Sequence, residues 1–311
     1  MDGALVLDKP RGITSHDAVL AARRVLSERR IGHLGTLDPF ATGVLVLLVG
    51  SATRLAQFYR DRDKTYLGTI RFGYSTDTFD STGNATSPDS GGVPDEGQLR
   101  NLFAQFVGTC AQVPPLFSAK KVGGVPAHRL ARKGRELALA PVPVTIHELD
   151  LLSSEGPLAQ FRTRVSSGTY VRALAHDLGK RLGIGAHLAA LRRIAVGEFT
   201  EATVVPLADL EARLRRGERV LIPSEELLPE FPATFLSGNA AQRVLTGQDV
   251  EIESEAPRVK LLDASGRLCA VGYRVIEHRY HPVVVLARDG EGGVSALPAT
   301  AASPARSVQS H

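Results

Sequence analysis

One aspartate lies in a segment with several glycines, Gly35-Thr36-Leu37-Asp38-Pro39-Phe40-Ala41-Thr42-Gly43. Glycine permits backbone conformations closed to other residues and allows the close approach of a bulky ligand. A carboxylate in such a loop could act as a nucleophile or as a base. Because an aspartate in a loop is more often a turn or cap residue, this segment alone gives only a hypothesis of catalysis.

A second segment, Ser167-Gly168-Thr169-Tyr170-Val171-Arg172, contains a tyrosine and an arginine two residues apart. We expect a strand over residues 169–172, which would place Tyr170 and Arg172 on one face. An arginine there could pair with a carboxylate, lower its pKa and so hold it ionised. It could equally form a structural ion pair.

The composition is that of an ordinary soluble globular protein. The 311 residues are 43% hydrophobic and 23% charged, enough for one large domain and a small one. No apolar run approaches the length of a membrane span, and the start lacks the basic segment and cleavage site of a secretory signal. We therefore expect a cytoplasmic protein with no membrane partner and no obligate protein partner.

Metal and cofactor signals are weak. Cys110 and Cys269 are single and far apart, so no zinc knuckle or disulfide framework is indicated. His278 and His281 have an HxxH spacing without a third ligand nearby, which favours ordinary strand residues. The chain has neither a Walker loop nor a GxGxxG before a helix, so we expect no cofactor and no metal.

A net charge of +4 is compatible with a polyanionic partner without proving one. Positive charge is concentrated between residues 118 and 143, at Lys120, Lys121, Arg129, Arg132, Lys133 and Arg135. This segment could be a solvated surface loop. It could also be a basic flap that closes over a phosphate backbone.

The elements that must position the two segments are predicted from periodicity. We expect strands over residues 4–7, 65–72 and 161–165, while the apolar run 44–49 could be a strand or a helix. Thr14 to Asp17 resembles a capping box that begins a helix. Another helix is expected through Leu174, Leu178 and Leu182, and then a short one through Leu188 and Leu191.

The chain changes character between residues 206 and 232, with a helix and, near the end of this stretch, three prolines. Short strand-like runs at 258–262 and 282–287 indicate a small β-rich second domain. Residues 298–311 are rich in Ala, Ser and Pro, and we expect them to be disordered.

Together the segments resemble the tRNA pseudouridine synthase B family, whose members isomerise uridine 55 in the T-loop of tRNA. The resemblance covers nearly the whole chain. It rests on Leu7-Asp8-Lys9-Pro10, on Gly32-His33 with the loop of Asp38, on Lys64-Thr65-Tyr66, on Pro114-Pro115-Leu116-Phe117-Ser118-Ala119, on Gly168-Thr169-Tyr170-Val171-Arg172, and on the stretch from Gly185-Ala186-His187 to Leu191-Arg192-Arg193. Phe40, where the family usually has leucine, and the tail depart from the pattern.

The resemblance implies an α+β fold with a mixed, mainly antiparallel sheet flanked by helices. It implies a catalytic domain over residues 1–231, with 118–143 as an RNA-contacting insertion, and a PUA-like RNA-binding domain over 232–297. The partner would be tRNA, bound through its T-arm and on its acceptor side.

The resemblance also assigns roles to single residues. Asp38 would be the catalytic aspartate, Arg172 its ion-pair partner, and Tyr66 the catalytic residue that lies against the target base. Substrate would also meet His33, Tyr170, Leu191 and Lys9, and the RNA backbone would meet Lys120, Lys121, Arg132 and Lys133.

Two other functions compete with or accompany this one. A tRNA-folding chaperone activity is compatible with catalysis and could accompany it. An aspartyl-phosphate hydrolase generally needs a second acid two residues after the first, and position 40 is phenylalanine.

Overall fold

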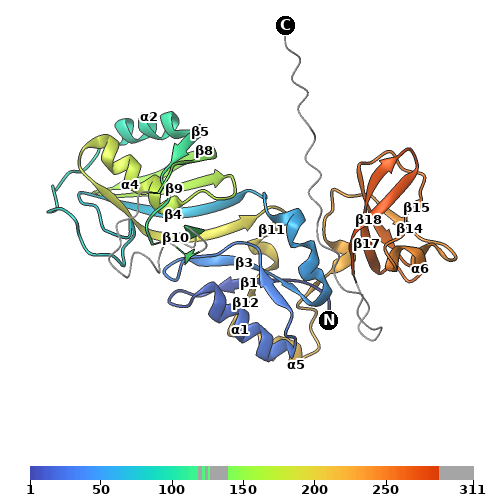
Figure 1. Ribbon diagram of the computed structural model, residues 1–311. Helices are drawn as coiled ribbons and strands as arrows, with labels where there is room; N and C mark the ends of the chain where they lie inside the picture. Colours follow the sequence, from blue (N-terminus) through green and yellow to red (C-terminus); the bar gives the residue numbers. More distant parts are fainter. Residues whose placement is uncertain (118–120, 123–124, 127–138, 287–311) are drawn as a thin grey trace, which may run out of the picture.

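The computed structural model describes residues 1–117, 121–122, 125–126 and 139–286. An 11-stranded sheet with the order β12-β1-β3-β10-β4-β9-β8-β5 runs through the larger part of the protein, with β2, β11 and β13 paired at its sides (Figure 1). Most neighbours are antiparallel, and the pairs β1–β12 and β10–β3 are parallel. The predicted α+β class with a mixed, mainly antiparallel sheet is confirmed.

The strands of this sheet are β1 (Gly3–Lys9), β2 (Ile31–His33), β3 (Thr42–Val49), β4 (Lys64–Phe72), β5 (Gly108–Gln112), β8 (Val142–Glu155), β9 (Leu158–Val165), β10 (Ala186–Val196), β11 (Phe199–Thr200), β12 (Val205–Pro206) and β13 (Ile222–Pro223). The short strands β6 (Lys121–Val122) and β7 (Val125–Pro126) pair with each other. The apolar run over residues 44–49 is a strand, since it belongs to β3, which is buried along almost its whole length.

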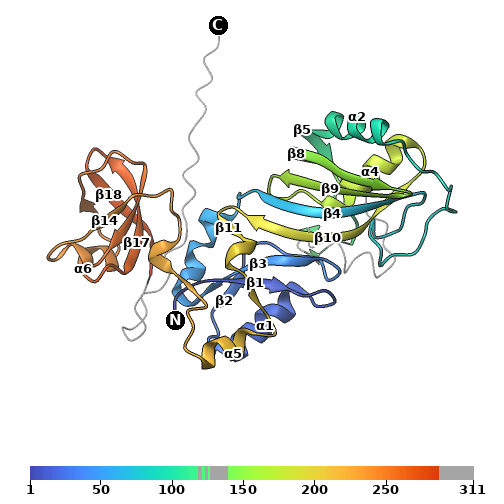
Figure 2. The ribbon, with the colours of Figure 1, turned by 180° about the vertical axis from the view of Figure 1, so that it is seen from behind.

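Helices cover the sheet in two groups. Helices α1 (Ser15–Leu26) and α5 (Leu210–Arg215) pack on β1 and β3, while α2 (Glu96–Phe106) and α4 (Val171–Leu182) pack on the half that contains β4, β8, β9 and β10 (Figure 2). Short 3-10 segments are η1 (Gly50–Tyr59), η2 (Glu201–Thr203) and η3 (Ser224–Glu226). Within the described ranges, every helix is too short or too polar to cross a membrane.

The predicted capping box at the start of α1 is confirmed. The Thr14 hydroxyl accepts from the Asp17 backbone N–H at 3.1 Å, and the Asp17 carboxylate accepts from the Thr14 backbone N–H at 2.9 Å. Two donors that the first helical turn leaves open are thus satisfied within four residues.

The strand predicted over residues 169–172 was wrong. The chain turns at Gly168, which has φ +88°, and α4 begins at Val171, so Arg172 lies in the first helical turn. The backbone N–H and C=O of Tyr170 are both bonded to the Gln112 side chain. Tyr170 and Arg172 therefore do not share a strand face.

The short helix predicted through Leu188 and Leu191 was also wrong, because both residues lie in β10. The register between β10 and β4 shifts between Leu188 and Ala190, which marks a β-bulge. A bulge adds one residue on one strand, so side chains three positions apart can face the same side. Both leucines are buried in one cluster, and their spacing imitates that of a helix.

The C-terminal part is the predicted β-rich unit. A five-stranded sheet has the order β14-β16-β17-β18-β15, and a short helix α6 (Ala240–Leu245) packs on it. Its strands are β14 (Ala233–Phe235), β15 (Val250–Glu251), β16 (Arg258–Leu262), β17 (Leu268–Ile276) and β18 (Arg279–Val285).

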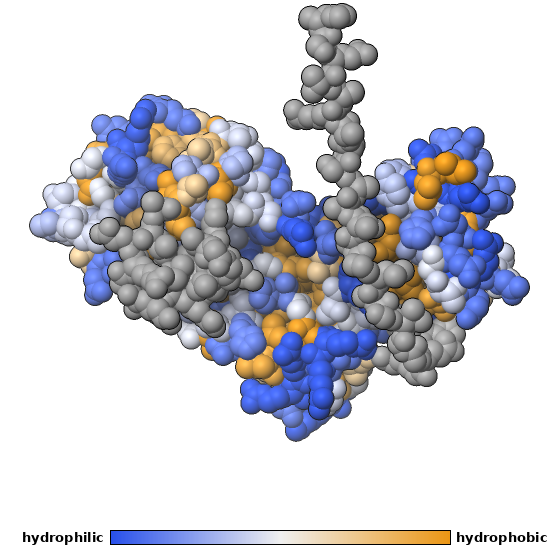
Figure 3. Space-filling model, viewed as in Figure 1, coloured by the Kyte–Doolittle hydropathy of each residue, from blue (hydrophilic) through white to orange (hydrophobic). Residues whose placement is uncertain are grey.

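The two sheets share a hydrophobic core. Leu262, Leu268 and Val284 from the small sheet belong to the same buried cluster as Val6 and Leu48 from the large one. Hydrophobic surface lines the notch between the two parts on the face drawn in Figure 3. Packing of this kind couples the unfolding of the two parts.

Leu262→Ala is expected to destabilise the whole protein, since the shared core would keep a cavity after truncation. The expected loss is about 2–5 kcal/mol of unfolding free energy. Urea unfolding followed by circular dichroism should still show one transition. Val283→Ala, at a side chain 48% exposed in the same sheet, is the matched control and should change stability by less than about 0.5 kcal/mol. Separate transitions for the two parts would contradict the shared core.

Candidate active site

Asp38 and Arg172 form a two-point ion pair. Arg172 Nε donates to Asp38 Oδ2 at 2.8 Å, and Arg172 Nη2 donates to Asp38 Oδ1 at 3.2 Å. The Asp38 side chain is 33% exposed, whereas that of Arg172 is 5% exposed. The carboxylate thus lies where a ligand from solvent can reach it, and the guanidinium lies behind it.

The loop that carries Asp38 is fixed from both sides. Ser15 Oγ of α1 bonds both the N–H and the C=O of Leu37, at 2.8 and 3.0 Å. The fully buried guanidinium of Arg193 donates to the carbonyls of Gly35, Thr36 and Val44. Gly43 has φ +100°, and a Cβ there would lie 2.2 Å from Arg193 O, so only glycine fits this close approach.

Asp80 is a site residue that the sequence reasoning missed. Its Oδ2 lies 3.5 Å from Arg172 Nη1, and its side chain is 5% exposed. Its Oδ1 accepts from the Thr78 and Thr82 hydroxyls and from the Thr82 backbone N–H. An aspartate with a threonine two residues on is a turn signal, but nothing local shows that this turn folds onto Arg172.

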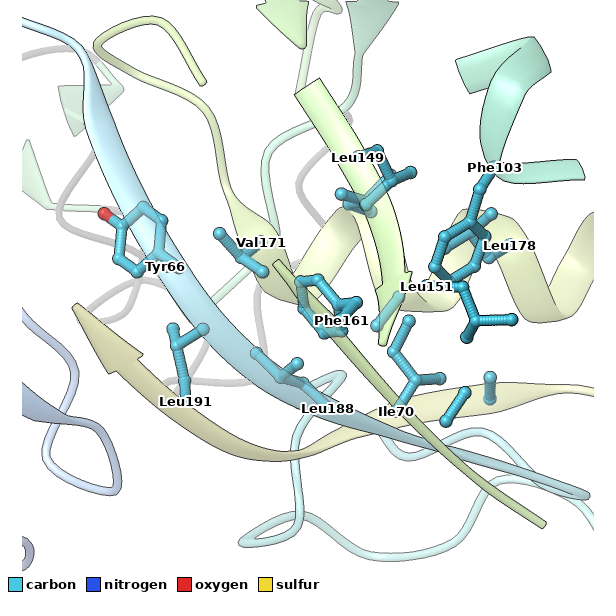
Figure 4. Packing of buried hydrophobic residues seen from close by; sticks show 14 of the residues in the cluster. Tyr66, Ile70, Phe103, Leu149, Leu151, Phe161, Val171, Leu178, Leu188 and Leu191 are labelled. Atoms are coloured by element: carbon cyan, nitrogen blue, oxygen red, sulfur yellow. The ribbon is translucent and has the colours of Figure 1, made fainter. Parts of the chain in front are cut away.

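Tyr66, Leu191 and Val171 lie together at one end of the cluster that β4, β10 and α4 enclose (Figure 4). Tyr66 is 8% exposed, and its hydroxyl points away from Phe161 and Leu188. The ring is therefore held by apolar packing, while its hydroxyl points away from these cluster residues. Phe40, which departs from the family pattern, is buried in the same cluster.

The other predicted substrate-binding residues lie in different surroundings. His33 is exposed at the end of β2, and its pKa is lowered by burial of part of the ring and by nearby Arg193. Tyr170 is half-buried immediately before α4. Their contacts with substrate stay predictions.

Lys9 is completely buried behind the loop of Asp38. Its Nζ donates to the carbonyls of Pro10 and Ile13, each at 2.9 Å, and to that of Pro39 at 3.5 Å. Burial, together with the charge of Arg193 and against the attraction of Asp38, lowers the pKa of Lys9 to about 8. The side chain braces the loop, and its predicted contact with substrate stays a prediction.

Lys64 is a second buried amine near Arg193. Its Nζ donates to Arg62 O at 2.5 Å and to Ser167 Oγ at 2.9 Å. Burial and then the charge of Arg193 lower the pKa of Lys64 to about 8. The surroundings of the Asp38 loop are thus rich in buried positive charge.

The predicted RNA-backbone residues Lys120, Arg132 and Lys133 and the side chain of Lys121 lie outside the described residues. Among the residues that are described, no group of three or more His, Cys, Asp or Glu side chains could hold a metal ion. His281 Nδ1 lies 2.8 Å from Asp249 Oδ1, which gives this histidine a carboxylate partner.

The fold is similar to that of solved RNA-related structures. A chain of an H/ACA RNP bound to a substrate RNA containing 2'-deoxyuridine matches with a TM-score of 0.69 and 23% identity, over 93% of this chain and 86% of that chain. A chain of a Cbf5-Nop10-Gar1 complex matches with a TM-score of 0.67 and 26% identity, over 89% and 79%.

Sequence comparisons agree with the fold. A model of the N-terminal domain of TruB family pseudouridylate synthases matches residues 23–171, and one of the tRNA pseudouridylate synthase B C-terminal domain matches residues 172–229. The tRNA pseudouridine synthase B of Solibacter usitatus (strain Ellin6076) is 44% identical over 294 residues, which are 92% of this chain and 100% of the relative. That of Aquifex aeolicus (strain VF5) is 40% identical over 256 residues, 82% and 88% of the two chains.

The matched family models and the similar relatives define a pseudouridine synthase, an enzyme that isomerises uridine within RNA. The chain belongs to the TruB family of pseudouridylate synthases, and the family predicted from the motifs is confirmed.

Lys9→Met is expected to change how stability depends on pH. In the folded protein the Lys9 amine has a pKa of about 8, and in the unfolded chain its pKa returns to the ordinary value of 10.5. The unfolded state binds more protons between these values, so this group makes stability rise with pH across that window. Lys9→Met should remove that part of the rise.

Urea unfolding at several pH values between about 7.5 and 10 measures the slope. Lys180→Met, at an exposed lysine of α4, is the control and should keep the wild-type slope. Equal slopes for wild type and Lys9→Met would refute the role of burial at Lys9.

Proposed function

We propose that this protein converts uridine 55 in the T-loop of tRNA to pseudouridine, with Asp38 as the essential carboxylate. The observation that carries the proposal is the geometry at Asp38, which is open to solvent on one side and bonded through both oxygens to Arg172 on the other. The two relatives compared are named tRNA pseudouridine synthase B, and the match covers most of their length.

The reaction detaches uracil from C1′, rotates it and rejoins it through C5. A uridine inside a folded T-loop must first be flipped out, at a cost of a few kcal/mol. Stacking on the Tyr66 ring contributes about 1–3 kcal/mol and offsets much of that cost. In this proposal His33, which is exposed at the end of β2, fills the vacated space.

Asp38 must be ionised to act, because a protonated acid is a poor nucleophile. Two bonds from a permanently charged guanidinium fit an ionised carboxylate. Such a group can attack C1′, add to the uracil ring or take a proton from the ribose. In this proposal the Tyr66 hydroxyl, which points away from Phe161 and Leu188, is the candidate to accept the C5 proton. This role requires the phenol to ionise in the complex.

We also propose the domain roles. Residues 1–231 form the catalytic domain, with 118–143 as a basic insertion that contacts RNA, and residues 232–297 form a PUA-like domain on the acceptor side of the tRNA. The matched family models end at residue 229, so this last role is supported by the β-rich sheet alone. A tRNA-folding chaperone activity accompanies catalysis in this proposal.

Asp38→Asn is expected to abolish pseudouridine formation, because the amide keeps the size of the carboxylate but cannot ionise. Binding of tRNA should stay within about tenfold, since the loss falls on the transition state. Unmodified tRNA is incubated with the protein, and pseudouridine is mapped by site. Asp209→Asn, at an exposed aspartate before α5, is the control. Wild-type rates in Asp38→Asn, or product only at sites outside the T-loop, would refute the proposal.

Neutralising Lys120, Lys121, Arg132 and Lys133 together is expected to weaken tRNA binding and flatten its salt dependence. The slope of log affinity against log salt is negative, and its magnitude should decrease by roughly 0.7–0.9 for each phosphate that is no longer neutralised. Binding titrations at several salt concentrations measure this slope. An unchanged slope would exclude these four residues from the interface.

A further inference from the structure

We propose that Phe79 and His176 are positioning residues for the Asp38–Arg172 pair, and that their stacked rings hold residues 78–80 against the Arg172 guanidinium. The inference rests on the proposed function, since it concerns the same site. Neither ring is bonded to Asp38 or to Arg172, and both would act through Thr78 and Asp80.

Arg172 interacts with acceptors on both sequence neighbours of Phe79, which are Thr78 and Asp80. Its Nη1 donates to Thr78 O at 2.9 Å and lies 3.5 Å from Asp80 Oδ2. A main-chain carbonyl and a side chain two residues later thus converge on one nitrogen. Phe79 between them has φ +64°, and this left-handed turn of the backbone brings the two groups together.

The left-handed conformation is disfavoured for a bulky residue and persists only where the surroundings hold it. Two backbone bonds contribute, from Phe79 N–H to Thr76 O at 3.2 Å and from Leu188 N–H to Phe79 O at 3.0 Å. The Phe79 ring supplies the third restraint, because it stacks on the His176 ring at 3.9 Å between centroids and 16° between planes.

His176 is one helical turn after Arg172 on α4, so the two side chains lie on the same helix face. The Phe79 and His176 rings, called the clamp below, therefore attach residues 78–80 to α4 one helical turn from the Arg172 guanidinium. His176 Nδ1 is buried and has no hydrogen-bond partner among the described residues. Burial and then the charge of Lys180 lower the pKa of His176, which favours the neutral ring. Stacking on the Phe79 ring, rather than a hydrogen bond through Nδ1, therefore explains the position of the His176 side chain.

Without the clamp, Thr78 O and the Asp80 carboxylate would move away from Nη1. Phe117 O, which accepts from Nη2 at 3.0 Å, would then be the remaining partner besides Asp38 within the residues that the structure describes, and the guanidinium could turn away from Asp38. A displacement of about 1 Å at a reacting group can cost on the order of a hundredfold in rate. Substrate binding should change little, because neither ring is among the residues proposed to contact the base or the RNA backbone. The expected signature is a lower kcat at nearly constant KM.

The first experiment measures pseudouridine formation by Phe79→Ala and His176→Ala. Each should lower kcat by roughly tenfold or more, with KM within about twofold. Phe79→Tyr keeps the ring and should restore kcat. Phe79→Gly removes the ring but also the cost of the positive φ, so its kcat should lie between those of wild type and Phe79→Ala.

Tyr74→Ala is the matched control. Tyr74 also packs on a histidine, His187, with ring centroids 4.7 Å apart, and it precedes the same loop. Neither ring of that pair flanks a partner of Arg172. The variant should lose thermal stability and keep the wild-type kcat.

The second experiment asks whether Phe79 acts through Asp80. Phe79→Ala and Asp80→Asn should each lower kcat, and the double variant should lose less than the product of the two factors. If kcat of the double variant falls by the product of the two single-variant factors, Phe79 and Asp80 act independently, and the inference is overturned. Wild-type kcat in both ring variants would overturn it as well.

A third readout does not depend on the reaction. The Arg172 Nε–H donates to Asp38, so its proton signal in nuclear magnetic resonance should exchange faster with water in Phe79→Ala and stay unchanged in Tyr74→Ala. An unchanged signal in Phe79→Ala would refute the positioning role. If the wild-type protein forms no pseudouridine while the proton still exchanges faster in Phe79→Ala, the proposed function is refuted and the positioning role of the clamp is retained.

Discussion

The site depends on supplying hydrogen-bond and ion-pair partners to one buried guanidinium, that of Arg172. Taking a charged group out of water costs several kcal/mol unless partners replace the water. Arg172 finds them in two carboxylates and two carbonyls, from Asp38, Asp80, Thr78 and Phe117. The partners come from separate stretches of the chain. A single buried cation thereby fixes the place of Asp38 relative to the sheet and to α4.

The same physical need shapes the backbone around Asp38. Lys9, Lys64 and Arg193 are buried cations whose hydrogen bonds, within the described part of the chain, go to carbonyls and one hydroxyl. Carbonyl oxygens solvate these charges without neutralising them, so positive charge accumulates near the loop. An RNA substrate brings its own negative phosphates to such a place. The hydrogen bonds from these buried cations thus hold the loop in place, and the same positive charges favour binding of the polyanionic RNA.

Sequence patterns were most informative for elements whose conformation is determined by residues close together in the sequence. The capping box of α1 and the strands β1, β4, β9 and β16 follow from residues within one turn or one strand. The family was identified from several segments taken together, each of which is short and contiguous in the sequence. Three features have non-local causes: the bulge that places Leu188 and Leu191 on one face of β10, the start of α4 set by Gln112, and the turn of Asp80 onto Arg172. Each depends on a partner far along the chain.

The small C-terminal sheet is joined to the large one by side chains as well as by the shared core. Lys260 Nζ donates to Glu225 O at 2.8 Å and to Leu227 O at 3.1 Å, and the Arg258 guanidinium lies 5.7 Å from the ring centres of Phe58 and Phe231. Burial of Lys260 lowers its pKa. If both parts bind one tRNA, as proposed, their geometry is set before the RNA arrives. Less freedom is then lost on binding than with a flexible linker, and more of the contact energy remains for flipping the base.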